Sequence, residues 1–225
     1  MGRALAHGFA REGARVVVAG RTESEVRRVA TEVEQQVGGQ ALHAVCDVSD
    51  EPQVKQLVAS TLERFGRVDI LVNNAGVGNI RPLWGMRKSS FERILTVNLI
   101  GTFLCTKHVW RPMRQGGGRS IINIASLGAT RGYPLLSAYC ASKWGQVGFT
   151  LACAEEGKEA GIRVNAVAPG KVDTAFRAQI KEDKQRMLKA EDHVGICLFL
   201  ASDEAHYITG QVIAVEWYGP EVSTG

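Results

Sequence analysis

Short runs of apolar, mostly β-branched residues alternate along this chain with longer segments whose apolar residues recur at helical spacing. A short run that is apolar on both faces is typical of a strand inside a parallel sheet, and helical spacing is typical of an amphipathic helix. Strands are therefore predicted at residues 15–20, 41–46, 68–72, 121–125, 162–168 and 211–216. Helices are predicted between them at residues 3–13, 23–37, 51–65, 89–113, 139–160 and 192–201.

Polar residues and glycines mark where several of these helices begin and end. Thr22, followed by Glu25, has the pattern of a capping box, and Ser49 or Asp50 is expected to cap the helix that ends at Gly66. Because strands and helices alternate throughout, the sequence predicts an α/β fold with a doubly wound, Rossmann-type, mostly parallel sheet and helices on both faces. No repeat or linker interrupts the pattern, so residues 1–225 are expected to form a single domain.

Composition and charge narrow the classes of function. The 225 residues are 45% hydrophobic and carry a net charge of +4, without a concentrated basic run. No apolar stretch reaches the roughly 18 residues of a membrane-spanning helix, so neither nucleic-acid nor membrane partners are expected. The five cysteines and five histidines are scattered without metal-ligand spacing. This distribution predicts buried free thiols in a reducing compartment such as the cytoplasm, and no metal site.

The candidate chemistry is concentrated around Tyr139 and Lys143, which stand one helical turn apart on the same face of a predicted helix. A nearby cation favours the phenolate and lowers the pKa of a tyrosine, so that it exchanges protons with a carbonyl or an alcohol more readily. Ser126, at the end of the strand before this helix, is placed to hydrogen-bond the same substrate oxygen. Taken alone, this spacing is common on ordinary helices, and the pair is more often structural than catalytic.

Polar and glycine residues also follow the other predicted strands. In a parallel sheet all the carboxyl ends lie at one edge, and ligands bind beyond them. Turn residues at strand ends explain the glycines, but they do not explain the grouping of Ser126, Tyr139 and Lys143. The residues at this edge are Gly20-Arg21, Asp47-Val48, Asn73-Asn74-Ala75-Gly76, Ser126, and Pro169-Gly170 with Val172 and Thr174 beyond.

Together these motifs resemble the short-chain dehydrogenase/reductase family over essentially the whole chain. The matching features recur in order and at family spacing. They are Asn73-Asn74-Ala75-Gly76, Asn98 in Val-Asn-Leu-Ile-Gly, Ser126 thirteen residues before Tyr139, Tyr139-x-x-x-Lys143, Pro169-Gly170-Lys-Val-Asp-Thr174 and Ile208-Thr209-Gly210-Gln211.

The resemblance implies a role for each matching residue. Tyr139 would be the proton donor and acceptor, Lys143 would lower its pKa and hold the nicotinamide ribose, and Ser126 would orient the substrate carbonyl. Asn98 would hold a water that links Lys143 to solvent. The remaining cofactor contacts would be Gly2 at the phosphates, Asp47 and Val48 at the adenine, Asn73, Asn74, Ala75 and Gly76 beside the adenosine, and Pro169, Gly170, Val172 and Thr174 at the nicotinamide.

Cofactor choice is predicted from the end of the first strand. Arg21 follows this strand and no carboxylate occurs before Glu23. A guanidinium at this place pairs with a 2′-phosphate, whereas a carboxylate would bind the ribose hydroxyls of NAD. NADP is therefore the expected cofactor and NAD the alternative, unless Arg21 is an ordinary surface residue at a helix start.

One departure from the family concerns the beginning of the chain. The family opens with a strand and a glycine-rich turn that approaches the pyrophosphate, and Met1-Gly2 matches only the last positions of that turn. The sheet would then lack its central strand, between residues 15–20 and 68–72, and two strand edges would be left unpaired. Met1 is therefore expected not to be the natural first residue of a working enzyme, and this polypeptide is expected to be unstable or to bind its cofactor weakly.

Two functions follow as competing expectations. The first is an oxidoreductase, similar to 3-oxoacyl reductases, that interconverts a ketone and a secondary alcohol. The second is a truncated, cofactor-free remnant that acts only as an oligomer partner. By resemblance, the chain is expected to form a homotetramer or homodimer through its two long helices. The substrate is not evident from the sequence, and Trp84, Leu127 and Tyr133 are the candidates for lining an apolar pocket.

Overall fold

The structure is a computed structural model that describes residues 1–117, 119–173 and 187–217. Every predicted strand is present within about two residues of its expected bounds. The strands are β1 (Val16–Gly20), β2 (Ala41–Val45), β3 (Ile70–Asn73), β4 (Arg119–Ile124), β5 (Ile162–Pro169) and β6 (Val212–Val215). The helices are α1 (Gly2–Arg11), α2 (Glu23–Glu32), α3 (Glu51–Phe65), α4 (Lys88–Leu95), α5 (Gly101–Gln115), α6 (Ser137–Gly157) and α7 (Val194–Ala201).

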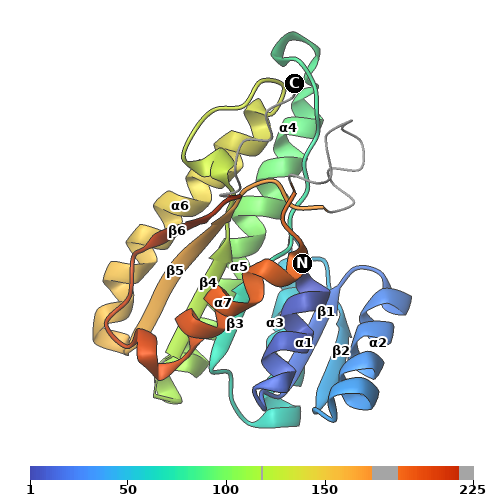
Figure 1. The fold of residues 1–225 in the computed structure, drawn as a ribbon, viewed down its shortest axis with the longest axis vertical. Helices are drawn as coiled ribbons and strands as arrows, with labels where there is room; N and C mark the ends of the chain where they lie inside the picture. The colour runs from blue at the N-terminus through green and yellow to red at the C-terminus, as the bar shows by residue number, and fades with distance from the viewer. Residues whose placement is uncertain (118, 174–186, 218–225) are drawn as a thin grey trace, which may run out of the picture.

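All the strands pair in parallel, but they form two sheets instead of one (Figure 1). Strand β1 pairs with β2 in a two-stranded sheet, and β3, β4, β5 and β6 follow one another in a four-stranded sheet. Among the described residues, one edge of β1 and one edge of β3 therefore have no strand partner. The expectation of two unpaired edges is confirmed. The described residues form two separate sheets and not one continuous sheet.

Helices cover both faces of the larger sheet, because neighbouring residues of its strands point to opposite sides. Ile121 in β4 packs with Val109 and Met113 of α5 on one face. The next residue, Ile122, packs with α1 and α7 on the other face. The fold is therefore the predicted Rossmann-type α/β arrangement, with its core on both sides of β4 and β5.

Helix α1 joins the two sheets. Leu5 and Phe9 pack into the cluster that contains Ile122 of the larger sheet. Ala6 and Ala10, on a neighbouring face of the same helix, pack against α2 and β1. A helix with two apolar faces thus packs against both sheets, between which the described strands form no ladder. That residues 1–225 form one domain stays a prediction.

The helix ends agree with the sequence in one place and differ in another. Asp50 accepts a hydrogen bond from the backbone N–H of Gln53 at 3.1 Å and begins α3, and Gly66 ends this helix with a left-handed φ of 79°. The capping box predicted at Thr22 is wrong, because the Thr22 side chain makes no capping hydrogen bond. Thr22 is exposed, so solvent can satisfy its hydroxyl without a bond to the helix.

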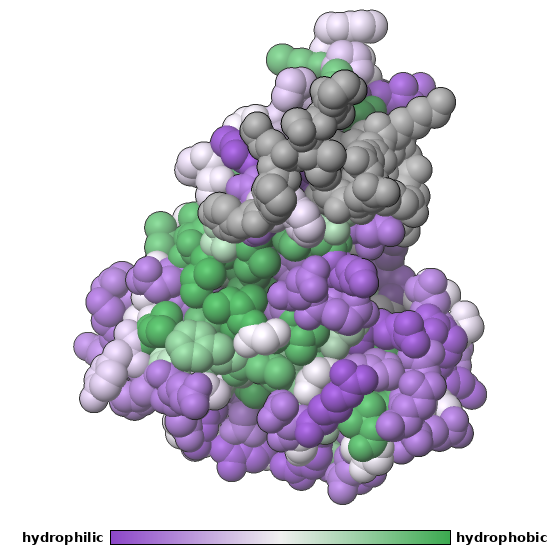
Figure 2. All heavy atoms as spheres, viewed as in Figure 1, coloured by the Kyte–Doolittle hydropathy of each residue, from purple (hydrophilic) through white to green (hydrophobic). Residues whose placement is uncertain are grey.

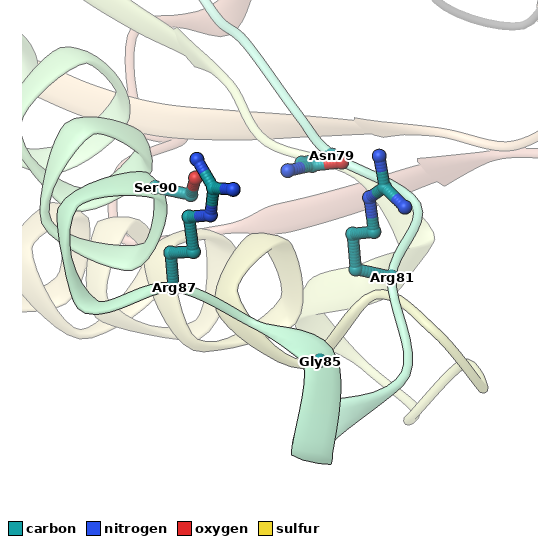
Figure 3. Close-up of a pocket in the computed structure, with 5 residues that line it drawn as sticks. All are labelled: Asn79, Arg81, Gly85, Arg87 and Ser90. Atoms are coloured by element: carbon teal, nitrogen blue, oxygen red, sulfur yellow. The ribbon is translucent and has the colours of Figure 1, made fainter.

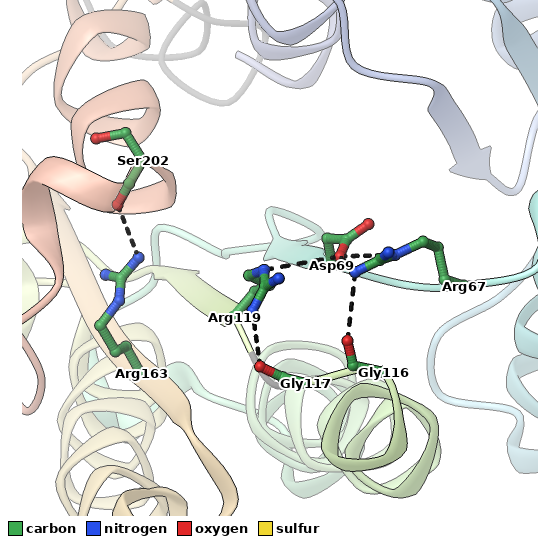
Figure 4. Close-up of polar contacts among 7 residues, drawn as sticks. All are labelled: Arg67, Asp69, Gly116, Gly117, Arg119, Arg163 and Ser202. Carbon is green, nitrogen blue, oxygen red and sulfur yellow. Dashed lines mark hydrogen bonds and ion pairs between the residues drawn. The ribbon is translucent and has the colours of Figure 1, made fainter.

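Arginine side chains bind the loops at the amino ends of the strands (Figure 4). Arg67 donates to Asp69 at 2.6 Å and to the carbonyl of Gly116, beyond the C-terminal end of α5, at 3.3 Å. Arg119 donates to the Gly117 carbonyl at 2.7 Å, and Arg163 donates to the Ser202 carbonyl at 3.1 Å. Cations suit helix C-terminal carbonyls because these carry partial negative charge. This edge is occupied by structural contacts, which leaves the opposite, carboxyl edge for a site.

Helix α7 is apolar around most of its circumference, with the sequence Val-Gly-Ile-Cys-Leu-Phe-Leu-Ala. Figure 2 shows apolar side chains gathered on the face of the molecule over α7 and β6. Cys197 and Leu200 are buried against the sheet, while Ile196, Leu198 and Phe199 are only partly buried. A surface helix usually has apolar residues on one face and polar residues on the other, whereas α7 has apolar residues on both.

His193, at the start of α7, predicts how stability depends on pH. Its side chain is fully buried, Nδ1 lies 3.1 Å from the Lys189 carbonyl, and Nε2 has no hydrogen-bond partner among the described residues. Burial lowers the pKa of His193 below its ordinary value. As the pH falls through the ordinary range near ~6.5, the unfolded chain takes up a proton that the folded chain excludes, so stability is lost on acidification.

We expect His193→Leu to reduce this loss. The free energy of unfolding, measured in urea at pH 8 and pH 5, should fall less on acidification in His193→Leu than in the parent chain. His206→Gln, at an exposed position, is the control for replacing a histidine. An identical pH dependence in the parent chain and His193→Leu would show that His193 does not titrate on unfolding.

Candidate active site

Tyr139 and Lys143 lie on one face of α6, as their spacing predicts. Lys143 Nζ is 5.9 Å from the centre of the Tyr139 ring. The lysine is only 3% exposed, and its Nζ donates to the carbonyl of Ile124, the last residue of β4, at 2.7 Å. Burial lowers the pKa of Lys143 to about 7. The predicted amine beside the phenol is therefore present, in an environment where its charge changes close to neutral pH.

The approach to α6 is a loop with a strained residue. Leu135 has a φ of 66°, which side chains other than glycine rarely adopt. Its carbonyl accepts a hydrogen bond from the backbone N–H of Arg81 at 2.9 Å. This contact ties the segment after β3 to the turn that enters α6, and it fixes the start of the helix that carries Tyr139.

Asn98 lies in a π-helical segment, Thr96–Ile100, between α4 and α5. It is fully buried, and its amide group exchanges two hydrogen bonds with the backbone of Val77, at 2.8 and 2.9 Å. It also donates to Ser142 of α6 at 2.9 Å. π-Helical turns inside helices occur frequently at functional sites. Asn98 thus fixes the loop after Gly76 against α6, while its predicted role in holding a water remains a prediction.

A chain of buried hydrogen bonds connects Lys143 to Asn98 through two residues that the sequence analysis missed. Lys143 Nζ donates to Gln146 Oε1 at 3.0 Å, and Gln146 Nε2 donates to Thr102 Oγ1 at 2.8 Å. Thr102 in turn donates to the Asn98 carbonyl at 2.8 Å. Helical spacing places Gln146 near Lys143 and Thr102 near Asn98, each pair on its own helical segment, but it does not predict that Gln146 and Thr102 bond each other.

Ser126 and Tyr139 lie on either side of one glycine. A Cβ atom placed on Gly128 would be 3.5 Å from Ser126 Oγ and 3.4 Å from Tyr139 Cε1. Ser126 Oγ accepts from the Gly128 N–H at 3.1 Å, which holds the hydroxyl at the end of β4. The two hydroxyl-bearing side chains are thus brought together as the sequence predicts.

Glycines also leave open backbone beside the other predicted site residues. A Cβ on Gly76 would be 3.5 Å from Asn98 Oδ1 and 3.8 Å from Lys143 Nζ. A Cβ on Gly2, at the start of α1, would be only 2.9 Å from Asn74 Nδ2. The structure therefore groups these positions at the carboxyl edge, where the sequence places them, and Ala75 and Gly76 are exposed there.

Arg21 and Asp47, at the ends of β1 and β2, form a loose ion pair with Arg21 Nη1 3.9 Å from Asp47 Oδ2. The pKa of Asp47 is lowered, first by hydrogen bonds from the Ser49 hydroxyl and backbone and then by the charge of Arg21. Val48 packs against α5, since a Cβ on Gly101 would lie 2.7 Å from its Cγ2. Arg21 keeps an exposed guanidinium, with 55% of its side chain accessible.

Several predicted contacts are less accessible. Asn73 donates to Asn123 at 2.8 Å and to Thr106 at 3.2 Å and is buried, so its side chain joins β3 to β4 instead of facing a ligand. Pro169 and Val172 are also buried. The Gly170 N–H bonds to the Val215 carbonyl at 2.8 Å. Thr174 lies outside the described residues.

The candidates for an apolar pocket separate in the structure. Leu127 is buried next to Gly170, whose Cβ would be 3.4 Å from its Cδ1. Trp84 is 91% exposed, so its predicted place in an apolar pocket is wrong. The reason is local, because residues 83–85 form a short 3₁₀ turn that carries the indole into solvent.

The described residues hold no cluster of metal-ligating side chains, and within them no helix is long and apolar enough to cross a membrane. All five cysteines are buried and unbonded, as predicted. Burial raises the pKa of Cys105 and of Cys197 to about 12, so these thiols are protonated at neutral pH.

Known proteins match this chain over most of its length. A family model described as short chain dehydrogenase matches residues 1–185. The chain is 34% identical to a 3-oxoacyl-[acyl-carrier-protein] reductase from Thermotoga maritima, over 96% of this chain and 92% of that protein. It is likewise 34% identical to levodione reductase from Leifsonia aquatica, over 96% and 88% of the two chains.

A solved structure of gluconate 5-dehydrogenase from Burkholderia cenocepacia, in complex with NADP and tartrate, matches with a TM-score of 0.89 and 30% identity, over 95% of this chain and 88% of that one. The fold is thus shared with solved members of this class of proteins. The chain belongs to the short-chain dehydrogenase/reductase family of oxidoreductases.

Proposed function

We propose that this chain interconverts a ketone and a secondary alcohol with a nicotinamide cofactor. The observation that carries the proposal is the grouping of Tyr139, Lys143 and Ser126 at the carboxyl end of β4. The family match and the relatives, which include reductases of different carbonyl compounds, support it. A 3-oxoacyl-reductase-like activity is one candidate within this class.

The residues present fit such a cofactor along the carboxyl edge. Residues at the start of α1 precede the first helical hydrogen bond, from the Leu5 N–H to the Met1 carbonyl, so their N–H groups suit a phosphate. Gly2 and Gly76 carry no side chain that would block the edge beside Asn74 and Lys143. The cofactor would lie across these residues toward Tyr139 and would supply or accept the hydride.

The chain's own residues handle the proton and the substrate oxygen. In reduction, the Tyr139 hydroxyl donates its proton to the carbonyl oxygen, and in oxidation the tyrosinate takes the proton from the alcohol. The Ser126 hydroxyl donates a second hydrogen bond that orients this oxygen. Lys143, when protonated, favours the tyrosinate. Gln146 and the Ile124 carbonyl hold the Lys143 amine in place at 3.0 and 2.7 Å.

The competing proposal is a cofactor-free remnant, favoured by the unpaired edges of β1 and β3. A cofactor that binds only the folded chain raises its thermal midpoint, whereas a remnant shows no shift. Thermal unfolding with NADPH and with NADH, followed by initial rates with a panel of ketones and alcohols, therefore separates the two. No shift with either cofactor and no turnover with any compound would contradict the enzyme and support the remnant.

Cofactor preference is expected to depend on Arg21. Its exposed guanidinium, at the end of β1, is placed for a 2′-phosphate, and Asp47 neutralises it only loosely at 3.9 Å. We expect a higher kcat/KM with NADPH than with NADH. In Arg21→Ala this preference should fall about tenfold, because losing one charge-assisted hydrogen bond costs roughly 1.4 kcal/mol. Initial rates with both cofactors measure it. An NADH preference that Arg21→Ala leaves unchanged would contradict this role.

A homo-oligomer remains part of the proposal. On α5, and at the end of the π-helical segment before it, Phe103 and Ile100 are 39% and 45% exposed, and on α6 Leu151 and Trp144 are 44% and 51% exposed. Exposed apolar side chains on two long helices support a dimer or tetramer formed through them. Light scattering of the purified chain tests this. The buried, unbonded cysteines support a reducing compartment such as the cytoplasm as its location.

A further inference from the structure

A polar pocket is formed by the segment that joins β3 to α4 and by the first turn of α4, close along the chain to Gly76 of the candidate active site. It has a volume of about 310 Å³ and is lined by Asn79, Arg81, Gly85, Arg87 and Ser90. Figure 3 shows the side chains of Arg81 and Arg87 extending in the same direction, with the Asn79 side chain between their ends. Each polar side chain here has at least one hydrogen-bond donor, and no carboxylate is among the lining residues.

The charges of the pocket are not neutralised by the part of the chain that the structure describes. Within it, neither Arg81 nor Arg87 forms a side-chain ion pair, whereas Arg3, Arg27, Arg28, Arg67 and Arg131 each pair with a carboxylate. The carboxylate on α4, Glu92, pairs with Lys88 at 3.3 Å. Two guanidinium groups that share one pocket repel each other, and an anion between them removes that cost.

The backbone holds the pocket in a fixed place relative to Tyr139. The N–H of Arg81 bonds to Leu135, two residues before α6 begins, and Val77 is fixed by Asn98. Gly76 adjoins Lys143, and Asn79 lies three residues further along the chain, which limits its distance from Gly76 to roughly 11 Å. The pocket therefore lies on the segment that continues directly from the residues grouped around Lys143.

We propose that this pocket binds the anionic end, a carboxylate or a phosphate, of the ketone or alcohol on which Tyr139 acts. The inference rests on the proposed function and narrows its substrates to anionic compounds. The arginines recognise the anion with paired N–H donors, and the Asn79 amide and Ser90 hydroxyl complete the donor set. The apolar pocket expected from the sequence is replaced by a cationic one at this side of the site.

The test compares a keto acid with its methyl ester, which has the same carbon chain but carries a methyl group and no charge at the carboxyl end. In the parent chain we expect kcat/KM for the acid to exceed that for the ester by about 10- to 100-fold, the range for hydrogen bonds to a charged group. In Arg81→Gln/Arg87→Gln the ratio should fall to about one. The matched control is Arg111→Gln/Arg114→Gln, which removes the same charge from the far end of α5 and should keep the ratio.

Binding of malonate, followed through the thermal midpoint, gives a second measurement that needs no turnover. Malonate should raise the midpoint of the parent chain and of the Arg111/Arg114 control more than that of the Arg81/Arg87 variant. If no compound is turned over, the proposed function fails, and the malonate comparison still decides the anion site. The proposal would be overturned if the parent chain had the same kcat/KM for acid and ester, or if the acid-to-ester ratio fell equally in both double variants. Midpoint shifts with malonate that do not depend on Arg81 and Arg87 would also overturn it.

Discussion

Tyr139→Phe is expected to lower kcat by at least the roughly 10²–10⁴-fold that a general acid or base contributes. The substitution keeps the ring, which is partly buried on α6 beside Lys143, and removes only the hydroxyl that exchanges the proton. Binding of the cofactor should change little, because the cofactor contacts along the edge remain. The thermal midpoint should likewise stay close to that of the parent chain.

Initial rates at saturating cofactor, together with the cofactor-induced shift of the thermal midpoint, separate the catalytic effect from a binding effect. Tyr207→Phe is the control, because this tyrosine is 93% exposed and lies far along the chain in the segment before β6. Near-normal turnover in Tyr139→Phe would exclude Tyr139 as the proton donor. A cofactor-induced shift lost together with turnover would instead indicate that the Tyr139 hydroxyl contributes to cofactor binding.

The sequence predicts that Tyr139 and Lys143 lie side by side because a helix places residues four apart on one face, whatever the rest of the fold. Predicting that Tyr139 and Lys143 are neighbours requires only that the segment containing both is a helix. The contact between Gln146 and Thr102, at 2.8 Å, depends instead on how α6 and α5 cross, and no local pattern specifies that crossing. The burial of Lys143, which moves its pKa to about 7, likewise follows from packing and not from spacing.

The sequence predicts the strand positions well, because runs of apolar residues mark segments that are buried. The runs do not say which strands pair with each other, because pairing depends on which strands are present. The unpaired edges of β1 and β3 could be expected only from the family resemblance, and their consequence is visible in burial. Most residues of β1 are partly exposed, whereas every residue of β4 after Arg119 is buried.

The errors at Thr22 and Trp84 share one physical cause. Both residues lie at the surface, where water satisfies a hydroxyl or surrounds an indole at little cost. Surface positions are therefore specified weakly by the sequence pattern. The cationic pocket of Arg81 and Arg87 was missed for the same reason, since a pattern of apolar positions carries no information on which surface charges share a pocket.

Gly157→Ala tests the packing that holds α6, and with it Tyr139 and Lys143, against the sheet. A Cβ on Gly157 would lie 2.1 Å from the carbonyl oxygen of Ile162 and 3.2 Å from the carbonyl carbon of the same residue. Ile162 is the first residue of β5 and is 2% exposed, and its register with Arg119 of β4 anchors it. A backbone oxygen held in this way cannot rotate aside as a flexible side chain would, so the end of α6 must move away from β5.

Overpacking of a core costs up to about 3 kcal/mol, and the better helix propensity of alanine returns about 1 kcal/mol. The clash outweighs the propensity gain, so we expect Gly157→Ala to lower the free energy of unfolding by about 2 kcal/mol, roughly a 30-fold change in the folding equilibrium. Gly195→Ala is the matched control, because this glycine is also helical and no described atom lies within 4 Å of its Cβ position. Urea unfolding should therefore show a lower midpoint for Gly157→Ala and an equal or higher one for Gly195→Ala. An unchanged midpoint in Gly157→Ala would mean that α6 and β5 do not approach each other as closely as the structure describes.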